Sequence, residues 1–227
     1  MDVKATVKFA DKNKLVRLKF PIPETFLGGI TVGDGPYVWE EKPNTEITFQ
    51  KWVGIKRGDE VYAVLNDGVY AGKVENGYIH LTLLRGAGYC FHPIPDRELY
   101  PQDRCLPRID CGRYVYNFRL FKGTMYEVNA QAERFNQLPY AINVFPTGQE
   151  KQAIQAIKIE GNVILGAFKS TSQDGYVLRI YNPSEMTETF TVHVNGNIFS
   201  DEVKAREVVS LAYKNGEFHF YQSKMLA

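Results

Sequence analysis

VYAVLNDGVYAGKVENGYIHLTLLRGAGYC (residues 61–90), FHPIPDRELYPQDRCLPRID (91–110) and CGRYVYNFRL (111–120) form one continuous stretch that decides the fold. Runs of alternating apolar and polar residues are separated by turn-forming residues, a pattern typical of short β-strands. Asn66-Asp67-Gly68 and Asn76-Gly77 are strong turn signals, because asparagine and glycine tolerate positive φ. We therefore expect strands at residues 60–65, 71–74 and 78–84, paired as an antiparallel meander, and a further strand at 112–121.

Outside this stretch the sequence predicts one helix and several more strands. The helix is expected at residues 124–136, where Met125, Val128, Ala132 and Phe135 recur at intervals near three and four. Pro139 ends it. The other expected strands are 14–20, 47–55 (with Trp52 in the core), 140–145, 163–169, 176–181, 190–194, 207–213 and 218–221.

Two domains are predicted, residues 1–150 and residues 151–227, with a junction at 145–157. In the second, short strands recur about every ten residues between turn signals, which indicates a small antiparallel β-sandwich. Within the first, residues 91–108 contain four prolines and cannot be a central strand. This segment is expected to be a long surface excursion.

The composition favours a mainly β protein. The 227 residues include 14 Tyr and 14 Phe, and aromatic residues are enriched in strands. A net charge of +1 gives no indication of nucleic acid or of a charged membrane surface as a partner. The sequence has neither an apolar run long enough for a transmembrane helix nor an apolar signal core at its start.

Cys90, Cys105 and Cys111 are the three cysteines. An odd, low count argues against a disulfide framework and favours a reducing compartment, so a bacterial cytoplasm is predicted. A metal site with His92 is the alternative, but the spacing lacks the C-x₂-C pair of zinc sites. The favoured interpretation is small buried thiols in or beside a loop, and no metal site is expected in this chain.

The carboxylates of the first domain are interpreted as turn residues. Asp67 lies in a turn and Asp110 at a strand start, where aspartate commonly accepts hydrogen bonds from nearby backbone N–H groups. No nucleophile elbow, H-E-x-x-H motif or phosphate loop is present. His80, His193 and His219 fall in strand patterns and are expected on partly exposed faces. The other acids considered are Glu75, Asp96, Glu98 and Asp103.

Several motifs recur here in the order found in one family. They are the tryptophan strand at 50–53, the Leu-Asn-Asp turn at 65–67, the strand 77–85 ending in LTLLR, and Asp110-x-Gly112 followed by alternating aromatics. Further along are the helix end at 135–139, Lys169, Asp174-Gly175 and LRIYN at 178–182. This succession resembles the C-terminal β-region of glycoside hydrolase family 38, the α-mannosidases. Two departures are Tyr114, where a histidine is common in the family, and the longer segment 91–108.

The resemblance implies the end of a galactose-mutarotase-like β-supersandwich followed by a small β-sandwich. It also implies that the full enzyme cleaves α-mannosides with retention, using an aspartate nucleophile and a zinc ion held in an N-terminal catalytic domain. That domain is missing from this chain. The expected role is therefore an accessory or scaffold portion of an α-mannosidase, inactive alone, without a cofactor of its own, and partnered by its own catalytic domain.

Arg85 is the best candidate for a functional residue, since the family has an arginine at this strand end near the mouth of the catalytic cleft. The alternative is an arginine paired with a local carboxylate. His92 and Arg97, on the excursion, are candidates for facing the missing domain and its substrate. A stand-alone carbohydrate-binding β-sandwich is the alternative function, and the loop aromatics that fit it are Tyr89, Phe91 and Tyr100.

Self-association is expected from the missing part of the supersandwich. Truncation should leave sheet edges and an apolar face uncovered in residues 1–150, and such surfaces promote pairing with other chains. A homo-oligomer built through this half is predicted. The alternative is that residues 2–20 fill the gap and the half closes on itself.

Overall fold

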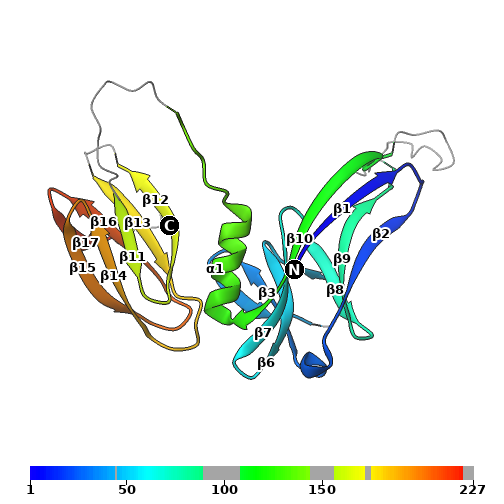
Figure 1. The fold of residues 1–227 in the computed structure, drawn as a ribbon, viewed down its shortest axis with the longest axis horizontal. Coiled ribbons are helices and arrows are strands. Elements are labelled where there is room, and N and C mark those ends of the chain that lie inside the picture. The colour runs from blue at the N-terminus through cyan, green and yellow to red at the C-terminus, as the bar shows by residue number, and fades with distance from the viewer. Residues whose placement is uncertain (44, 89–107, 144–155, 172–174, 222–227) are drawn as a thin grey trace, which may run out of the picture. The chain divides into compact units, whose positions relative to one another are not determined.

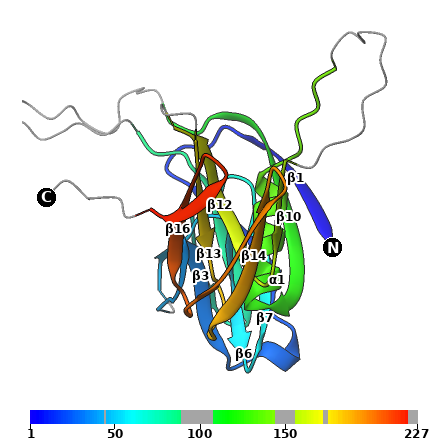
Figure 2. The same ribbon diagram turned by 90° about the vertical axis from the view of Figure 1, so that its left-hand side faces the viewer.

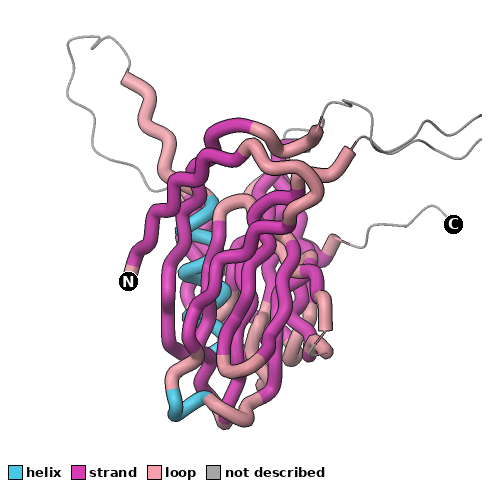
Figure 3. The backbone as a smooth tube through the Cα atoms, turned by 90° about the vertical axis from the view of Figure 1, so that its right-hand side faces the viewer, coloured by secondary structure: helices cyan, strands magenta, loops and turns pink. Residues whose placement is uncertain are grey.

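The computed structural model describes residues 1–43, 45–88, 108–143, 156–171 and 175–221, and most of these residues lie in strands (Figure 3). Contacts divide the chain into two compact units. The first unit joins Met1–Gly33 with Glu41–Lys122, and the second joins Asp34–Glu40 with Gly123–Ala227. The predicted mainly β class is confirmed, with one α-helix in the described part of the chain.

Two sheets form the framework of the first unit (Figure 1), and one of them extends through the end of β3 and most of β4 into residues of the second unit. One has the strand order β1-β10-β7-β6-β3-β4, and the other has the order β2-β9-β8-β5. The strands of the first are β1 (Asp2–Phe9), β3 (Ile30–Gly35), β4 (Val38–Glu41), β6 (Trp52–Arg57), β7 (Glu60–Asn66) and β10 (Gly112–Thr124). Those of the second are β2 (Leu15–Pro21), β5 (Ile47–Thr48), β8 (Ala71–Glu75) and β9 (Tyr78–Arg85), with a 3₁₀ turn, η1 (Glu24–Phe26), after β2.

The core of the first unit lies between these sheets, because both contribute to one apolar cluster. Phe20 on β2 packs edge-on against Phe118 on β10, with ring centres 5.4 Å apart. Phe118 is the buried member of the alternating aromatics predicted for β10. Trp52, the predicted core aromatic, is fully buried but is not a member of this cluster. The other buried members are Phe26, Ile47, Phe49, Val53, Ile55, Tyr62, Val64, Val69, Ile79 and Leu81.

The predicted three-stranded meander is wrong. β8 and β9 pair as expected, through a turn in which Asn76 and Gly77 have φ of 51° and 76°. However, β7 pairs with β6 in the other sheet. Residues 61–66 of β7 are all buried, as in an interior strand covered on both faces. The Asn66 side chain then accepts hydrogen bonds from the N–H groups of Gly68 and Val69, which turns the chain towards the second sheet.

The second unit contains the helix α1 (Met125–Asn136) and two sheets that confirm the predicted small β-sandwich (Figure 2). A capping box begins the helix: Glu127 N–H donates to Thr124 Oγ1, and Thr124 N–H donates to the Glu127 carboxylate. One sheet is β11 (Ile157–Glu160), β14 (Glu188–Val194) and β15 (Asn197–Val203). The other is β12 (Ile164–Ser170), β13 (Tyr176–Tyr181), β16 (Val208–Lys214) and β17 (Glu217–Phe220).

Side chains of both sheets form the core of this sandwich, and they include Leu178, Phe190, Val203 and Leu211. Residues Asp34–Glu40, far away in sequence, belong to the same unit. Within it, Trp39 is 1% exposed, and its indole Nε1 donates a hydrogen bond of 2.8 Å to the Pro183 carbonyl. The sandwich is therefore completed by a segment that precedes it by more than a hundred residues.

The strand predicted at 140–145 is not formed at residues 140–143, and 144–145 lie outside the described residues. Tyr140 and Ile142 are 89% and 73% exposed, so the apolar alternation that suggested a strand buries nothing there. Residues 145–155, the greater part of the junction predicted at 145–157, also lie outside the described residues, and the boundary near residue 150 stays a prediction. Across the described segments, no helix combines the length and hydropathy that a membrane span requires.

Candidate functional site

Arg85 ends strand β9 and is exposed, which leaves its guanidinium accessible. His92 and Arg97, the other two predicted substrate-binding residues, lie outside the described residues. The described surroundings of Arg85 come from residues on either side of positions 89–107. They consist of strands β2, β8 and β9 and the residues that flank them.

A β-bulge decides which face of the sheet Arg85 occupies. Arg17 pairs with Thr82, and Leu15 pairs with Arg85, so strand β9 carries one extra residue in this interval. In an uninterrupted ladder Leu84 would face the same side as Thr82, because side chains alternate with period two. The bulge instead brings Arg85 to the face of Leu15 and Arg17, which is the common effect of a bulge beside a functional site.

The backbone of Arg85 is fixed on both sides. Its N–H donates a hydrogen bond of 2.8 Å to Oδ2 of Asp110, which itself has a φ of 57°. The next residue, Gly86, donates its N–H to the Lys14 carbonyl at 2.9 Å. A side chain at position 86 would meet the Asp11 carbonyl oxygen at 2.2 Å, so only glycine fits this approach.

The interpretation of two acids as turn residues is confirmed by these contacts. Asp110 accepts the Arg85 backbone N–H, and Asp67 accepts both the N–H and the side-chain amide of Asn117, at 3.2 and 2.6 Å. Asp96, Glu98 and Asp103 lie outside the described residues. Each of the two acids therefore ties its turn to a strand that is distant in sequence, β9 for Asp110 and β10 for Asp67.

An open groove lies beside Arg85, with a volume of about 820 Å³. β2 and its preceding turn line one side, the end of β9 forms another, and Glu46 and Ala71 contribute the rest. The lining residues are Asn13, Lys14, Leu15, Arg17, Glu46, Ala71, Thr82, Arg85, Ala87 and Gly88. This groove, called the Arg85 groove below, has the size of a small-ligand site.

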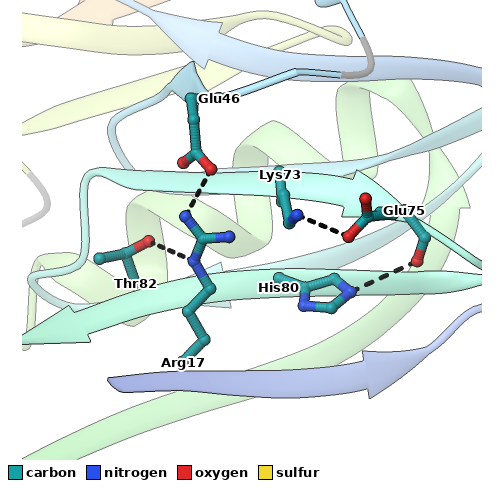
Figure 4. Close-up of polar contacts among 6 residues, drawn as sticks. All are labelled: Arg17, Glu46, Lys73, Glu75, His80 and Thr82. Carbon is teal, nitrogen blue, oxygen red and sulfur yellow. Dashed lines mark hydrogen bonds and ion pairs between the residues drawn. The ribbon is translucent and has the colours of Figure 1, made fainter. Parts of the chain in front are cut away.

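Arg17 is held in a fixed orientation on this face of the sheet (Figure 4). Its Nε donates a hydrogen bond of 3.2 Å to Thr82 Oγ1, and its Nη2 lies 2.5 Å from Glu46 Oε1. The Arg17 side chain is 18% exposed, whereas that of Glu46 is 63% exposed. The sequence suggested Arg17 only as one residue of an alternating strand, and gave no signal for Glu46, which lies in another segment.

His80 corrects a prediction, since it is buried at 6% exposure rather than placed on a partly exposed face. Its Nε2 lies 3.3 Å from the Glu75 carbonyl (Figure 4). Its ring packs edge-on against Tyr78, with ring centres 6.3 Å apart. In the sheet it lies between Lys73 on β8 and Lys19 on β2, its two ladder partners. The hydrogen bond from Lys73 lowers the pKa of the Glu75 carboxyl below its ordinary value.

Metal-binding side chains are not gathered at this site. Over the ranges that the structure describes, no three His, Cys, Asp or Glu residues are grouped so as to hold a metal ion. Cys111 is exposed, which corrects the expectation of a buried thiol. It follows Asp110, whose left-handed backbone conformation turns the chain immediately before β10. Cys90, Cys105 and His92 lie outside the described residues.

No protein-family model and no curated protein matches the sequence. Solved structures do match. An α-mannosidase from Enterococcus faecalis V583 superposes with a TM-score of 0.74 over 94% of this chain, at 14% sequence identity. A glycosyl hydrolase family 38 protein from Enterococcus faecalis gives a TM-score of 0.75, also over 94% of this chain, at 17% identity.

The fold is that of a part of family 38 α-mannosidase structures. The resemblance to the C-terminal β-region of this family, drawn from ordered motifs, is thus confirmed at the level of the fold. The chain spans only 27% and 28% of the lengths of the two matched chains. Sequence identities of 14% and 17% establish the fold of this chain and do not establish its activity.

Proposed function

We propose that this chain is the C-terminal accessory and scaffold portion of a retaining α-mannosidase. The observation that carries the proposal is the match of 94% of this chain to little more than a quarter of an α-mannosidase. The whole enzyme would hydrolyse α-mannosides, and the partner of this chain would be its own N-terminal catalytic domain. Zinc and the nucleophile would belong to that domain, in a cytoplasmic enzyme.

The Arg85 groove is the part of the chain that we assign to the edge of the active-site cleft. The bulge in β9 and the hydrogen bond to Asp110 fix the position of Arg85 before any ligand arrives, and preorganisation of this kind lowers the entropic cost of binding. His92 and Arg97 are proposed to face the same substrate. Arg85 is then a substrate-contacting residue rather than a member of the catalytic acid pair.

Self-association through residues 1–150 stays a proposal. β1 and β2, both from the first twenty-one residues, are edge strands of the two sheets, whose other edges are β4 and β5, and edge strands can pair with another chain. Light scattering tests this, since a monomer at high concentration would contradict it. In that case residues 2–20 would complete this half of the chain by themselves.

The test of function combines this chain with the catalytic segment that its own genome encodes. The chain alone should not turn over 4-nitrophenyl α-mannoside, with or without added zinc, whereas coexpression with the catalytic segment should restore turnover. Arg85→Gln should raise KM, and Arg113→Gln, an exposed change on β10, should leave it unchanged. Turnover by the chain alone would contradict the proposal. Tight binding of the chain alone on a glycan array would favour a stand-alone carbohydrate-binding module.

A further inference from the structure

We propose that strand β1 pairs with β1 of a second copy of this chain. The two strands would run antiparallel about a two-fold axis at Ala5, so that Asp2 of each copy lies opposite Lys8 of the other. This inference rests on the proposed self-association, and it names the strand and the register. It follows from the regularity of β1, from the direction of its backbone groups and from the order of its charges.

β1 is the longest and most regular edge strand of the two framework sheets, as far as the described residues extend. The edges of these sheets are β1, β4, β2 and β5. β4 and β5 contain only four and two residues, and β2 is interrupted by the bulge and ends at Pro21, which has no N–H to donate. β1 has eight residues in unbroken register with β10 (Figure 1). Short strands, bulges and prolines protect an edge from pairing, so β1 is the edge best able to accept another strand.

Every second residue of β1 directs its backbone groups away from β10. The Met1 amino group donates a hydrogen bond of 3.0 Å to the Leu120 carbonyl, and the Leu120 N–H donates one of 2.9 Å to the Met1 carbonyl. Met1 and Leu120 are thus a hydrogen-bonded pair, and such pairs alternate along an antiparallel ladder. The backbone groups of the even-numbered residues therefore face the open edge. A second β1 can form hydrogen bonds only where its own even-numbered residues stand opposite them.

The side chains of β1 favour the same registers. Val3 and Ala5 pack against the core of the first unit, whereas the even-numbered residues from Asp2 to Lys8 are exposed. Residues directly opposite each other in a sheet share a face. With the axis at Ala5, Val3 stands opposite Val7 of the second copy, so the apolar face of β1 continues across the new pair.

Charge selects the axis at Ala5 among these registers. This axis places Asp2 opposite Lys8, places Lys4 opposite Thr6, and gives the longest overlap of the two strands. An axis at Lys4 would place Lys4 opposite its own copy, and an axis at Thr6 would place Lys4 opposite Lys8. Like charges directly opposite each other are destabilising, whereas opposite charges stabilise the pair.

Neighbouring charges on β10 strengthen this preference. Lys8 stands opposite Arg113 in the ladder with β10, so two cations lie side by side on the exposed face. Asp2 of the second copy would bring a carboxylate next to them. Arg119 already holds that carboxylate in place, since its Nε lies 2.7 Å from Asp2 Oδ1 and its Nη2 lies 2.9 Å from Oδ2. The pairing thus adds a negative charge where each copy has two neighbouring positive charges.

The first experiment measures the mass and the dimer dissociation constant of the whole chain by sedimentation equilibrium. The mass should be twice 25.9 kDa at high concentration and should fall to 25.9 kDa on dilution. Lys8→Glu should weaken dimerisation about tenfold, because it faces Asp2 and the two-fold axis repeats the contact. Lys169→Glu, the same charge change at an exposed position of β12, is the control and should leave the constant unchanged. Combining Asp2→Lys with Lys8→Glu should recover most of the loss.

The second experiment tests the register by cross-linking, with all three native cysteines replaced by serine. Ala5→Cys should form a disulfide-linked dimer on mild oxidation, because the Cα atoms of a non-hydrogen-bonded pair are about 4.5 Å apart, within disulfide range. Thr6→Cys is the matched control. It is the more exposed position, but its two copies would be offset by two residues, about 7 Å along the strand, and should cross-link slowly.

Each result supports or overturns the pairing. In a dimer, equal effects of Lys8→Glu and Lys169→Glu, or cross-linking of Thr6→Cys as fast as that of Ala5→Cys, would overturn it while leaving self-association through another surface. A monomer at high concentration would overturn both. The charge variants keep the native cysteines, so they test the pairing even where the serine background does not fold. None of these results depends on turnover in the coexpression assay.

Discussion

The guanidinium carbon of Arg206 lies 3.8 Å from the centre of the Trp39 ring, inside the second unit. The two residues are far apart in sequence, and the contact ties residues Asp34–Glu40 to the terminal sandwich. Arg206 is also within 3.3 Å of Glu185, which orients the cation. Trp39 is thus held by apolar burial, by a cation–π contact and by its hydrogen bond to Pro183.

Trp39→Ala should strongly destabilise the second unit. Truncating a fully buried tryptophan removes its apolar contacts and leaves a cavity, which costs about 3–5 kcal/mol. Urea denaturation followed by circular dichroism measures the loss of unfolding free energy. Tyr70→Ala, at a side chain that is 63% exposed, is the control and should change stability by less than about 0.5 kcal/mol. Equal effects of the two substitutions would contradict the role of Trp39.

Asn182→Ala should also destabilise the sandwich, through unsatisfied backbone groups. Asn182 is fully buried, and its Nδ2 lies 2.8 Å from the Met186 carbonyl and 3.0 Å from the Val203 carbonyl. Its Oδ1 accepts the Ser184 N–H at 2.8 Å. The expected loss of unfolding free energy is about 3 kcal/mol, since buried groups lose their partners. Asn162→Ala is the control and should be nearly neutral, because Asn162 is exposed and its amide donates to the carboxylate of the half-buried Glu188.

Ionisation of the Tyr181 phenol should lower the stability of the protein at alkaline pH. Burial, with the negative charge of Asp34 as a second cause, raises the pKa of its phenol well above the ordinary value of 10.0. The raised pKa means that the stabilisation is complete below pH 10 and is lost as the pH rises towards the folded pKa, because only the unfolded state releases the proton. Unfolding free energy should fall above pH 10 by about 1.4 kcal/mol per pH unit for this proton.

Tyr181→Phe removes that slope and isolates the effect. Within the described chain the Tyr181 hydroxyl has no hydrogen-bond partner, so the substitution should cost little at pH 7. Urea denaturation between pH 8 and pH 11 measures the difference between the two proteins. Tyr70→Phe, at an exposed position, serves as the control. Parallel pH profiles for the natural protein and Tyr181→Phe would contradict the assignment.

Lys73→Gln should raise the pKa of Glu75. The hydrogen bond from Lys73, and then its charge, hold the pKa of Glu75 below the ordinary value of 4.5. The stabilisation from this pair is present above pH 4.5 and is lost as the pH falls through the folded pKa. Carboxyl carbon NMR titration measures the change directly. Lys4→Gln, on strand β1, should leave the Glu75 titration where it is.

Local features of the fold were predictable from the residues that form them. The Asn76-Gly77 hairpin needs positive φ at two adjacent positions, and this pair of residues tolerates it. The helix begins where Thr124 and Glu127 form a capping box. Trp52, within a strand pattern, is buried as expected. In each case the cause lies within a few residues of its effect.

Pairing between distant strands was not predictable in the same way. β7 and β8 follow each other through a short turn, yet burial on both faces keeps β7 in the other sheet. His80 is polar and stands between apolar residues, which suggested exposure, but it is buried, with Lys73 and Lys19 as its ladder partners from two other segments. Residues 34–40 contain Gly35 and Pro36, which are typical of a turn, while Trp39 of the same segment is buried in the second unit.

The candidate site was predictable in part. Arg85 at the end of a strand suggested a functional residue, but its face depends on an extra residue in β9 that appears only in the pairing with β2. Arg17 and Glu46 come from separate segments, and only the folded sheet brings their charges together. Residue type was therefore readable from the sequence, whereas the direction of a side chain depends on register.

The discontinuous second unit has a consequence for how such genes can recombine. A crossover at any single point between residues 41 and 122 would transfer residues 123–227 without Asp34–Glu40. The recipient would inherit a sandwich whose surface against Trp39 is uncovered, with a bare apolar patch beside Arg206. Transfer of residues 123–227 to another gene should therefore succeed only when the donor sequence starts before residue 34. The two units are then expected to be inherited together.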